Sequence, residues 1–312
     1  MRRFAFSWSA LAVVALAAVT AVLAVAALRA PSTGSGATPA PTGSALSNPP
    51  TVTQQPGGAR DIGAPDVEPP LALVDLRHAY RGTVGTCSGG STLERTIDGG
   101  ESWQSVDAPV AALTDIDAKT SVVVTVVGAD ASCRPASWSS TSAGREWSGP
   151  AVTAGSWFRF PGTTKSIHAP VGVSSNPCPD VSVAVREVEG LGLLDGVLLC
   201  PEGELFSSVD GGATWARTSV VEGAVALAWD TPAAGSVLQQ GSRTCPGFQL
   251  LRSIDTGTSW QTGGCVGDES DASSQATSPS LDFVDPLNGM ATVEGGVYVT
   301  TDGGLNWQVS AG

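Results

Sequence analysis

The stretch SSVDGGATW, residues 207–215, recurs in variant form along this chain of 312 residues. Close copies read TIDGGESW (96–103), SVDGGATW (208–215), SIDTGTSW (253–260) and TTDGGLNW (300–307), and a fifth reads STSAGREW (140–147). The shared pattern is Ser or Thr, any residue, Asp, any residue, Gly, two further residues and Trp, with Ser142 replacing the aspartate in the fifth copy. Five copies in register indicate a repeat architecture rather than a single functional motif.

Each fixed position of the repeat has a mechanical role in a tight turn. The aspartate carboxylate is expected to accept hydrogen bonds from backbone N–H groups of the turn that follows it. The glycine supplies a positive φ, and the tryptophan buries its ring between layers. These positions are Asp98, Asp210, Asp255 and Asp302, then Gly100, Gly212, Gly257 and Gly304, then Trp103, Trp147, Trp215, Trp260 and Trp307. The alternative, that the aspartates bind a metal or act as acids, is disfavoured because each belongs to a different repeat.

The spacing of the copies predicts the size of the repeating unit. Successive tryptophans stand 44, 68, 45 and 47 residues apart, and about 45 residues form one four-stranded blade of a β-propeller. We therefore expect an all-β propeller of four-stranded blades, five of which carry the motif. The step of 68 residues leaves two alternatives open, an insertion around 156–177 or a sixth, unmarked blade.

Apolar residues around the motif support the same architecture. Leu93, Leu205, Leu250 and Val297 each precede a motif aspartate by five residues, where one face of a third strand should pack into the core. The apolar runs 121–129, 195–200 and 223–230 are predicted to form inner strands, since a strand buried on both faces shows no polar alternation.

The repeats resemble the Asp-box, or bacterial neuraminidase, repeat of sialidases and of many non-catalytic propellers. The last copy, GGVYVTTDGGLNW (295–307), is also similar to repeats of photosystem II assembly and stability factors. The resemblance covers residues 71–312. It implies that each box joins the third and outermost strands of a blade, on the rim opposite the face that binds ligands, and it does not fix an activity.

Six cysteines favour three disulfides in an oxidising compartment. Four of them precede the third residue of their own motif by nine to eleven positions, at the turn between second and third strands, and the other two lie between blades. Both kinds of loop emerge on the same face of a propeller. The predicted pairs are Cys87–Cys133, Cys178–Cys200 and Cys245–Cys265, one of fifteen possible connectivities. A metal site is the alternative, but no Cys-x-x-Cys and no Cys/His pair at ligand spacing occurs.

The chain before the repeats divides into two predicted segments. Residues 1–29 contain Arg2 and Arg3 followed by an uncharged apolar run to Leu28, long enough for a membrane-spanning helix with a cytoplasmic N-terminus. A cleaved signal peptide is the alternative. Residues 30–70, rich in Pro, Gly, Ser and Thr, read as a disordered linker. The propeller, 71–312, is thus predicted to lie outside a cell membrane on a single-pass anchor, or to be secreted.

Charge limits the class of partner. Residues 61–312 carry 29 acidic and 12 basic side chains, a net charge of −17. Such a surface repels polyphosphate, so nucleic acid is not expected as a partner. A protein or a cell-envelope polysaccharide is expected instead, with the membrane reached through the N-terminal segment.

One stretch raises the question of catalysis. Phe158-Arg159-Phe160-Pro161 resembles the Phe-Arg-Ile-Pro motif of sialidases, whose arginine binds the carboxylate of the substrate. Here the stretch follows two repeats instead of preceding the first. Only Tyr80 and Tyr298 are available as a nucleophile, and Tyr298 falls on a predicted third strand. Convergence of Arg159, Arg186 and Arg243 on the central channel would favour catalysis.

The same region supplies candidate binding residues. Trp157, Arg159, Lys165 and His168 combine aromatic and cationic groups in an acidic chain, which suits a polysaccharide, a peptide or an anionic group. The alternative is that Trp157 and Phe158 fill the core. The sequence favours a non-catalytic, membrane-tethered binding or assembly module without metal or cofactor. A sialidase-like glycoside hydrolase and an assembly or stability factor for a membrane complex are the alternatives.

Overall fold

The computed structural model describes residues 67–153, 155–160, 163–180, 187–192, 194–242, 245–267 and 278–310. All of them belong to one compact unit, Pro56–Gly312. The expected membrane anchor, 1–29, and most of the expected linker lie outside these residues. Within them, no helix has the length and apolarity to cross a membrane.

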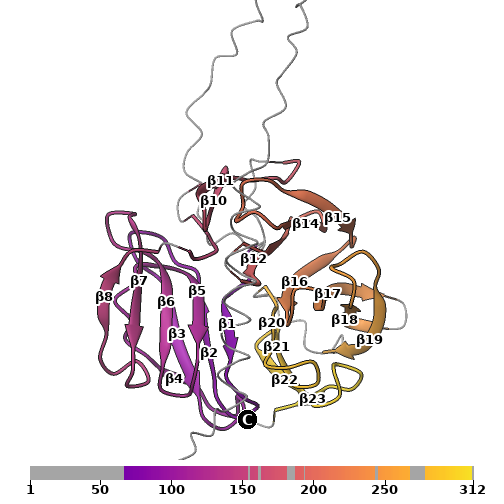
Figure 1. The fold of residues 1–312 in the computed structure, drawn as a ribbon. Coiled ribbons are helices and arrows are strands. Elements are labelled where there is room, and N and C mark those ends of the chain that lie inside the picture. The colour runs from indigo at the N-terminus through magenta and orange to yellow at the C-terminus, as the bar shows by residue number, and fades with distance from the viewer. Residues whose placement is uncertain are drawn as a thin grey trace, which may run out of the picture. The chain divides into compact units, whose positions relative to one another are not determined.

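The described residues contain twenty-three strands in six sheets, and neighbouring strands pair antiparallel (Figure 1). Blade 1 contains β1 (Leu71–Leu73), β2 (Ala79–Thr83), β3 (Thr92–Thr96) and β4 (Gln104–Ser105), and blade 2 contains β5 (Ala112–Ala118), β6 (Val124–Ala129), β7 (Pro135–Ser140) and β8 (Ser148–Ala151). Blade 3 contains β9 (Phe158–Arg159), β10 (Ser166–Ala169) and β11 (Gly172–Ser175), and blade 4 contains β12 (Glu187–Gly190), β13 (Gly196–Leu199), β14 (Glu204–Ser208) and β15 (Ala216–Val220). Blade 5 contains β16 (Ala224–Trp229), β17 (Gly235–Ser242), β18 (Cys245–Ser253) and β19 (Gln261–Val266), and blade 6 contains β20 (Ser280–Phe283), β21 (Gly289–Val293), β22 (Gly296–Thr300) and β23 (Gln308–Val309).

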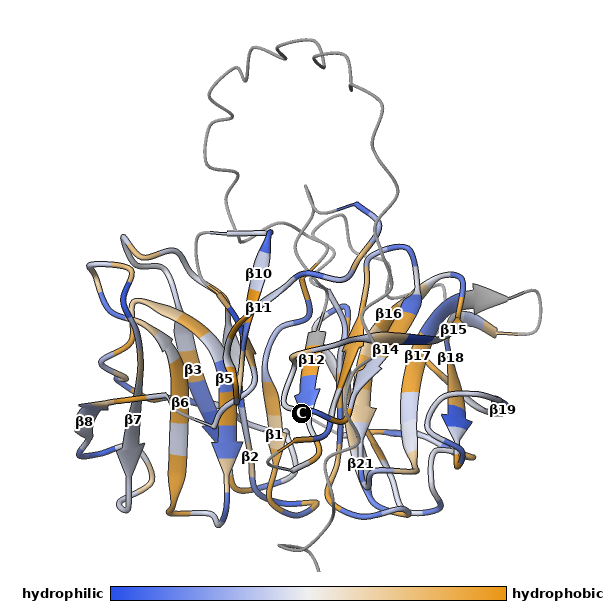
Figure 2. Ribbon diagram, turned by 45° about the horizontal axis from the view of Figure 1, so that its top comes forward, coloured by the Kyte–Doolittle hydropathy of each residue, from blue (hydrophilic) through white to orange (hydrophobic). Residues whose placement is uncertain are grey.

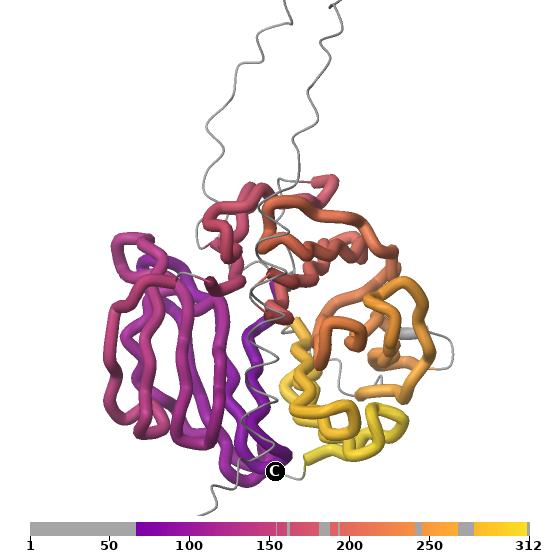
Figure 3. Tube along the Cα trace, viewed as in Figure 1, coloured from indigo at the N-terminus to yellow at the C-terminus, as the bar shows by residue number. Residues whose placement is uncertain are grey.

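The six sheets close into a ring, so the fold is a six-bladed β-propeller. The first strand of each blade contacts the first strand of the next, and β20 of blade 6 contacts β1 of blade 1. The first and last blades therefore lie side by side (Figure 3). Within the described ranges every sheet is built from consecutive strands, so none of these sheets combines strands from the first and last blades.

The 68 residues between the motif tryptophans Trp147 and Trp215 contain a sixth blade without the motif, blade 3. It has three strands where the sequence predicted four. Among the residues that the structure describes, the strand without a counterpart in blade 3 is the inner one. Trp215 donates to Ser174 on β11 just as Trp260 donates to Ser219 on the outer strand β15, so β11 holds the outer position. Gly212 approaches Ala169 of β10, as Gly304 approaches Leu250 on a third strand.

The hydrophobic core lies between neighbouring blades. One cluster joins Leu238 and Leu250 of blade 5 to Leu281 and Phe283 of blade 6. Equivalent clusters join blades 1 and 2, 3 and 4, 4 and 5, and 6 and 1. Each sheet thus buries its apolar faces against its neighbours, as expected for a repeat unit that has no complete core of its own.

The predicted core positions before each motif are confirmed, since Leu93, Leu205, Leu250 and Val297 are all buried. The prediction of inner strands is right for 223–230, which contains β16, and wrong for 121–129 and 195–200, which form the second strands β6 and β13. A second strand is also covered on both faces by adjacent blades, so apolar runs mark both kinds of strand. Figure 2 shows β6 and β16 as largely hydrophobic and the outer strand β19 as more polar.

The loops that carry the motif connect the third and fourth strands of their blades. In blade 4, one carboxylate oxygen of Asp210 accepts from the backbone N–H of Thr214 at 2.9 Å, and the other accepts from its hydroxyl at 2.6 Å. Ser208 Oγ accepts from the N–H of Gly212, whose φ is 86°. The same contacts recur around Asp98, Asp255 and Asp302. The seventh motif position is therefore a donor in these four loops: Ser102, Thr214, Ser259 and Asn306.

The fifth loop departs from this pattern at two coupled positions. Ser142 Oγ accepts from the N–H of Glu146 at 2.9 Å, which replaces one aspartate contact. The second contact has no equivalent, because the Glu146 carboxylate has no hydrogen to donate. This loop therefore lacks both the aspartate at the third motif position and the side-chain donor at the seventh.

We expect the double substitution Ser142→Asp, Glu146→Ser to raise the free energy of unfolding by about 1 kcal/mol, since it adds a charge-assisted hydrogen bond. Ser142→Asp alone should give less, because it sets a carboxylate beside Glu146. Thermal unfolding of the wild type, both single variants and the double variant measures the coupling. Additive effects of the two changes would contradict it.

All three predicted disulfides are present: Cys87–Cys133, Cys178–Cys200 and Cys245–Cys265. The first joins blades 1 and 2, the second joins the end of blade 3 to blade 4, and the third lies within blade 5. One detail differs from the expectation. Cys265 is in the outer strand β19, not in a connection between blades.

Candidate functional site: a groove between the first two blades

The predicted binding residues 157–168 do not form one surface. Trp157, Phe158 and Arg159 are buried, with 6%, 1% and 4% of their surface exposed. Trp157 packs edge-on against Trp215 between blades 3 and 4. His168 stacks on Phe158 at 4.4 Å between ring centroids, and its Nδ1 contacts the carbonyl of Ser156. Of the predicted set only Lys165 is exposed. Trp157 therefore belongs to the core between blades 3 and 4 and is not an exposed binding residue.

Arg159 reaches the central channel, where it meets the segment that precedes β1. Its Nη2 donates to the carbonyl of Glu68 at 3.0 Å. The Glu68 carboxylate accepts from the N–H of Leu227 on β16 at 2.8 Å and from that of Leu281 on β20 at 3.1 Å. Glu68 is 3% exposed. We name residues 67–70 the hub segment, because they connect to blades 3, 5 and 6 from the centre of the ring.

A small cavity lies beside the hub segment. The cavity lined by Glu68, Thr114, Asp115 and Glu189 measures about 30 Å³, room for one or two water molecules. Because Arg159 is buried and its Nη2 donates to the carbonyl of Glu68, it is not open to a substrate carboxylate. Arg186 and Arg243 lie outside the described residues, so the expected comparison of the three arginines rests on Arg159 alone.

Asp282 is a second buried carboxylate that connects blades, in this case blades 6 and 1. Its carboxylate accepts from the N–H of Leu73 at 2.6 Å and from that of Phe283 at 2.8 Å. Burial raises the pKa of Asp282 to about 7, against the lowering effect of these two N–H groups. In contrast, hydrogen bonds from Ser102 and Thr96 lower the pKa of Asp98 to about 2, and those from Asn306 lower the pKa of Asp302 to about 2.

These shifts predict a stability maximum near pH 4–5. A raised folded pKa means that the folded state retains a proton that the unfolded state has lost, so stability falls as pH rises from about 4 to about 7. The lowered values of Asp98 and Asp302 act oppositely, and their contribution is lost as pH falls from about 4 to about 2. Melting temperatures measured across pH 2–8 should show both slopes. Asp282→Asn should flatten the upper slope and leave the lower one. An unchanged upper slope would contradict the assignment.

An open groove lies between the outer parts of blades 1 and 2. Its volume is about 790 Å³, and a second cavity of about 360 Å³ adjoins it along Ser105, Val106 and Asp107. Volumes of this size suit a ligand of several residues or rings. The lining comes from β3, β4, the connection to blade 2, β7, the degenerate loop of blade 2 and β8: Arg95, Gln104, Ser105, Val106, Asp107, Pro109, Trp138, Ala143, Gly144, Arg145, Trp147, Gly149 and Pro150.

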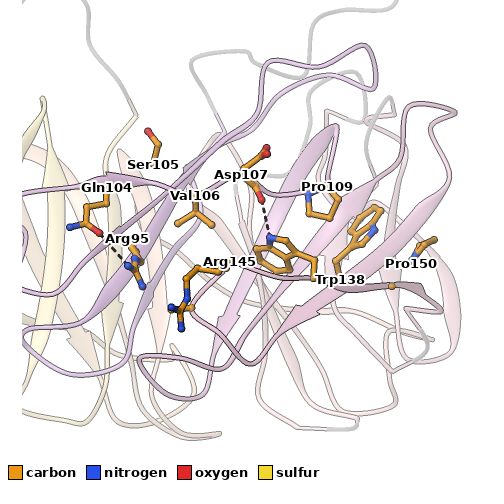
Figure 4. Close-up of a pocket in the computed structure, with 13 residues that line it drawn as sticks. Arg95, Gln104, Ser105, Val106, Asp107, Pro109, Trp138, Arg145 and Pro150 are labelled. Carbon is orange, nitrogen blue, oxygen red and sulfur yellow. Dashed lines mark hydrogen bonds between the residues drawn. The ribbon is translucent and has the colours of Figure 1, made fainter.

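Hydrogen bonds fix the walls of this groove (Figure 4). Trp147 Nε1 donates to the carbonyl of Asp107 at 2.8 Å, which ties blade 2 to the chain that leaves blade 1. Arg95 donates to Gln104 Oε1 at 3.2 Å. Arg145 is exposed, and its Nε donates to the carbonyl of Ser142 at 3.0 Å. Both guanidinium groups are held at the groove before any ligand arrives.

Sequence reasoning missed the groove. Arg145 stands where the other motif copies have Glu101, Ala213, Thr258 and Leu305, and its loop is the copy that lost the aspartate. The sequence signal for the groove was that the copy at 140–147 differs from the other four copies. A copy that lacks the structural aspartate is a candidate for a role in binding. That this loop and Arg95 line the same groove is seen only in the three-dimensional structure.

Three comparisons with known proteins show similarity to solved structures alone. A scan against protein-family models finds no match, and a search of curated proteins finds no significant relative. Among solved structures, similarity is found to YCF48 bound to D1 peptide, with 13% identity, 78% of this chain and 82% of that chain covered, and a TM-score of 0.31. It is also found to a GH74 xyloglucanase from Xanthomonas campestris (18% identity, 77% and 38% covered, TM-score 0.32) and to a GH74 enzyme from Niastella koreensis (14%, 76% and 45%, 0.40). At these values the similarities do not bear on the function of this chain.

Proposed function

We propose that this protein is a non-catalytic binding module whose ligand site is the groove between blades 1 and 2. The observation that carries the proposal is the placement of two arginines and an aromatic floor in a large open groove of a strongly acidic chain. The central channel, where propellers commonly place chemistry, is occupied by the hub segment. Among the described residues, no group of three or more His, Cys, Asp and Glu is placed to hold a metal ion.

The module is proposed to act outside a membrane to which residues 1–29 tether it, with residues 30–66 as a linker. Three disulfides support an oxidising compartment, because cytosolic proteins rarely keep them. A secreted form with residues 1–29 cleaved is the alternative. In this proposal the four aspartate loops are Asp-boxes with a structural role. An assembly role for a membrane complex is one form that such binding takes.

The proposal is tested with the full-length protein purified in mild detergent. Partner capture from the membrane fraction should be lost in Arg145→Glu and in the double variant Arg95→Glu, Arg145→Glu. It should be retained in Arg217→Glu, which makes the same charge change as Arg145→Glu on the exposed face of β15. Hydrolysis of a fluorogenic sialoside by the wild type, with loss in Arg159→Ala, would instead establish a sialidase-like enzyme.

A further inference from the structure

The groove has two chemically different ends. Figure 4 shows the guanidinium groups of Arg95 and Arg145 at one end together with Gln104, and Trp138 and Pro150 at the other. Trp138 is 5% exposed and forms part of the floor. A ligand that fills this groove therefore meets cationic donors at one end and apolar rings at the other.

Among the described residues, no carboxylate forms an ion pair with the two guanidinium groups at the cationic end, although Asp107 also lines the groove. Neither Arg95 nor Arg145 is within ion-pair distance of an acidic side chain among the residues that the structure describes. Arg95 is half-buried, and a partly desolvated guanidinium without a counter-charge is unfavourable. Residues 61–312 carry a net charge of −17, and the two guanidinium groups form a local cationic site within this acidic chain. Such a site suits a carboxylate of a ligand.

The edge of blade 1 distinguishes a peptide from a sugar. Arg95 pairs with Gln104 and Glu94 with Ser105, and the N–H of Val106 donates to the carbonyl of Leu93. Because residues alternate along an antiparallel ladder, the backbone N–H and carbonyl of Ser105 are directed away from β3. Ser105 lines both cavities. An extended peptide is the ligand that pairs with such an outer strand.

We infer that the groove binds an extended segment of a partner protein in which an acidic side chain lies a few residues from an aromatic or proline ring. The inference rests on the proposed function and names its ligand class. The carboxylate pairs with Arg95 and Arg145, the ring lies on Trp138 and Pro150, and the peptide backbone follows Ser105 into the adjoining cavity.

The test uses a phage-displayed library of random nonapeptides, selected on immobilised full-length protein in detergent and counter-selected on the Arg95→Glu, Arg145→Glu variant. Enriched sequences should carry Asp or Glu within about four residues of Trp, Phe or Pro, since extended residues advance about 3.3 Å each. A synthetic consensus peptide should then bind at least tenfold more weakly to Arg145→Glu, and to wild type when its acidic residues become Asn or Gln. Binding to Arg217→Glu should equal wild type.

Several outcomes overturn the inference. Enrichment of sequences without acidic residues, no enrichment at all, or equal loss in Arg217→Glu each contradicts a specific acidic-peptide site. Competition by an oligouronate but by no peptide assigns the groove to a glycan. If groove variants still abolish capture of a membrane partner while no peptide is selected, the proposed function stands and the ligand class is wrong. If neither effect is seen, both are wrong.

Discussion

Glu68→Ala is expected to lower the free energy of unfolding by about 2–4 kcal/mol, because two buried N–H groups lose their acceptor and each costs about 1–3 kcal/mol when unsatisfied. These are the N–H groups of Leu227 and Leu281, on blades 5 and 6. The effect is large for a residue that precedes the first strand. Chemical denaturation of the full-length protein measures it.

Two controls separate the hub contact from a general effect of charge. Glu202→Ala removes an exposed carboxylate from the loop between β13 and β14 and should change stability by less than about 0.5 kcal/mol. Glu68→Gln retains one acceptor oxygen and should lose about half as much as Glu68→Ala. If Glu68→Ala unfolds at the same denaturant concentration as wild type, the hub segment does not hold the ring together.

Removing the disulfide that joins blades 1 and 2 is expected to cost about 4 kcal/mol. Cys87 and Cys133 are 46 residues apart, and the stabilisation from restricting the unfolded chain grows with the length of the closed loop. Cys245 and Cys265, which are 20 apart within one blade, should contribute about 3 kcal/mol.

The measurement compares Cys87→Ser, Cys133→Ser with Cys245→Ser, Cys265→Ser under non-reducing conditions. Double serine variants avoid leaving a free thiol that exchanges with the other disulfides. A wild-type melting temperature for the first double variant would show that the contacts between blades 1 and 2 suffice without the covalent link.

Features that repeat along the chain were predictable from sequence. The loops around Asp98, Asp210, Asp255 and Asp302 are local, because each carboxylate bonds to groups four residues ahead. Their spacing fixes the blades, and the blades fix which cysteines share a face. Sequence reasoning therefore named the three disulfides correctly.

Features that occur once were not predictable in the same way. Glu68 lies in a proline-rich stretch that reads as linker, and its role depends on N–H groups 159 and 213 residues away. Trp157 and Arg159 looked like exposed binding residues because the residues that bury them, Trp215 and Glu68, lie far away in the sequence. The groove depends on how blades 1 and 2 pack, which neither repeat specifies alone.

The consecutive order of strands within each sheet has an evolutionary consequence. Since every blade is one uninterrupted run of chain, duplication or deletion of a single gene segment adds or removes a whole structural unit without splitting a sheet. Selection on such a chain acts on individual units, and a copy such as 140–147 is able to diverge toward a new task while its siblings preserve the scaffold.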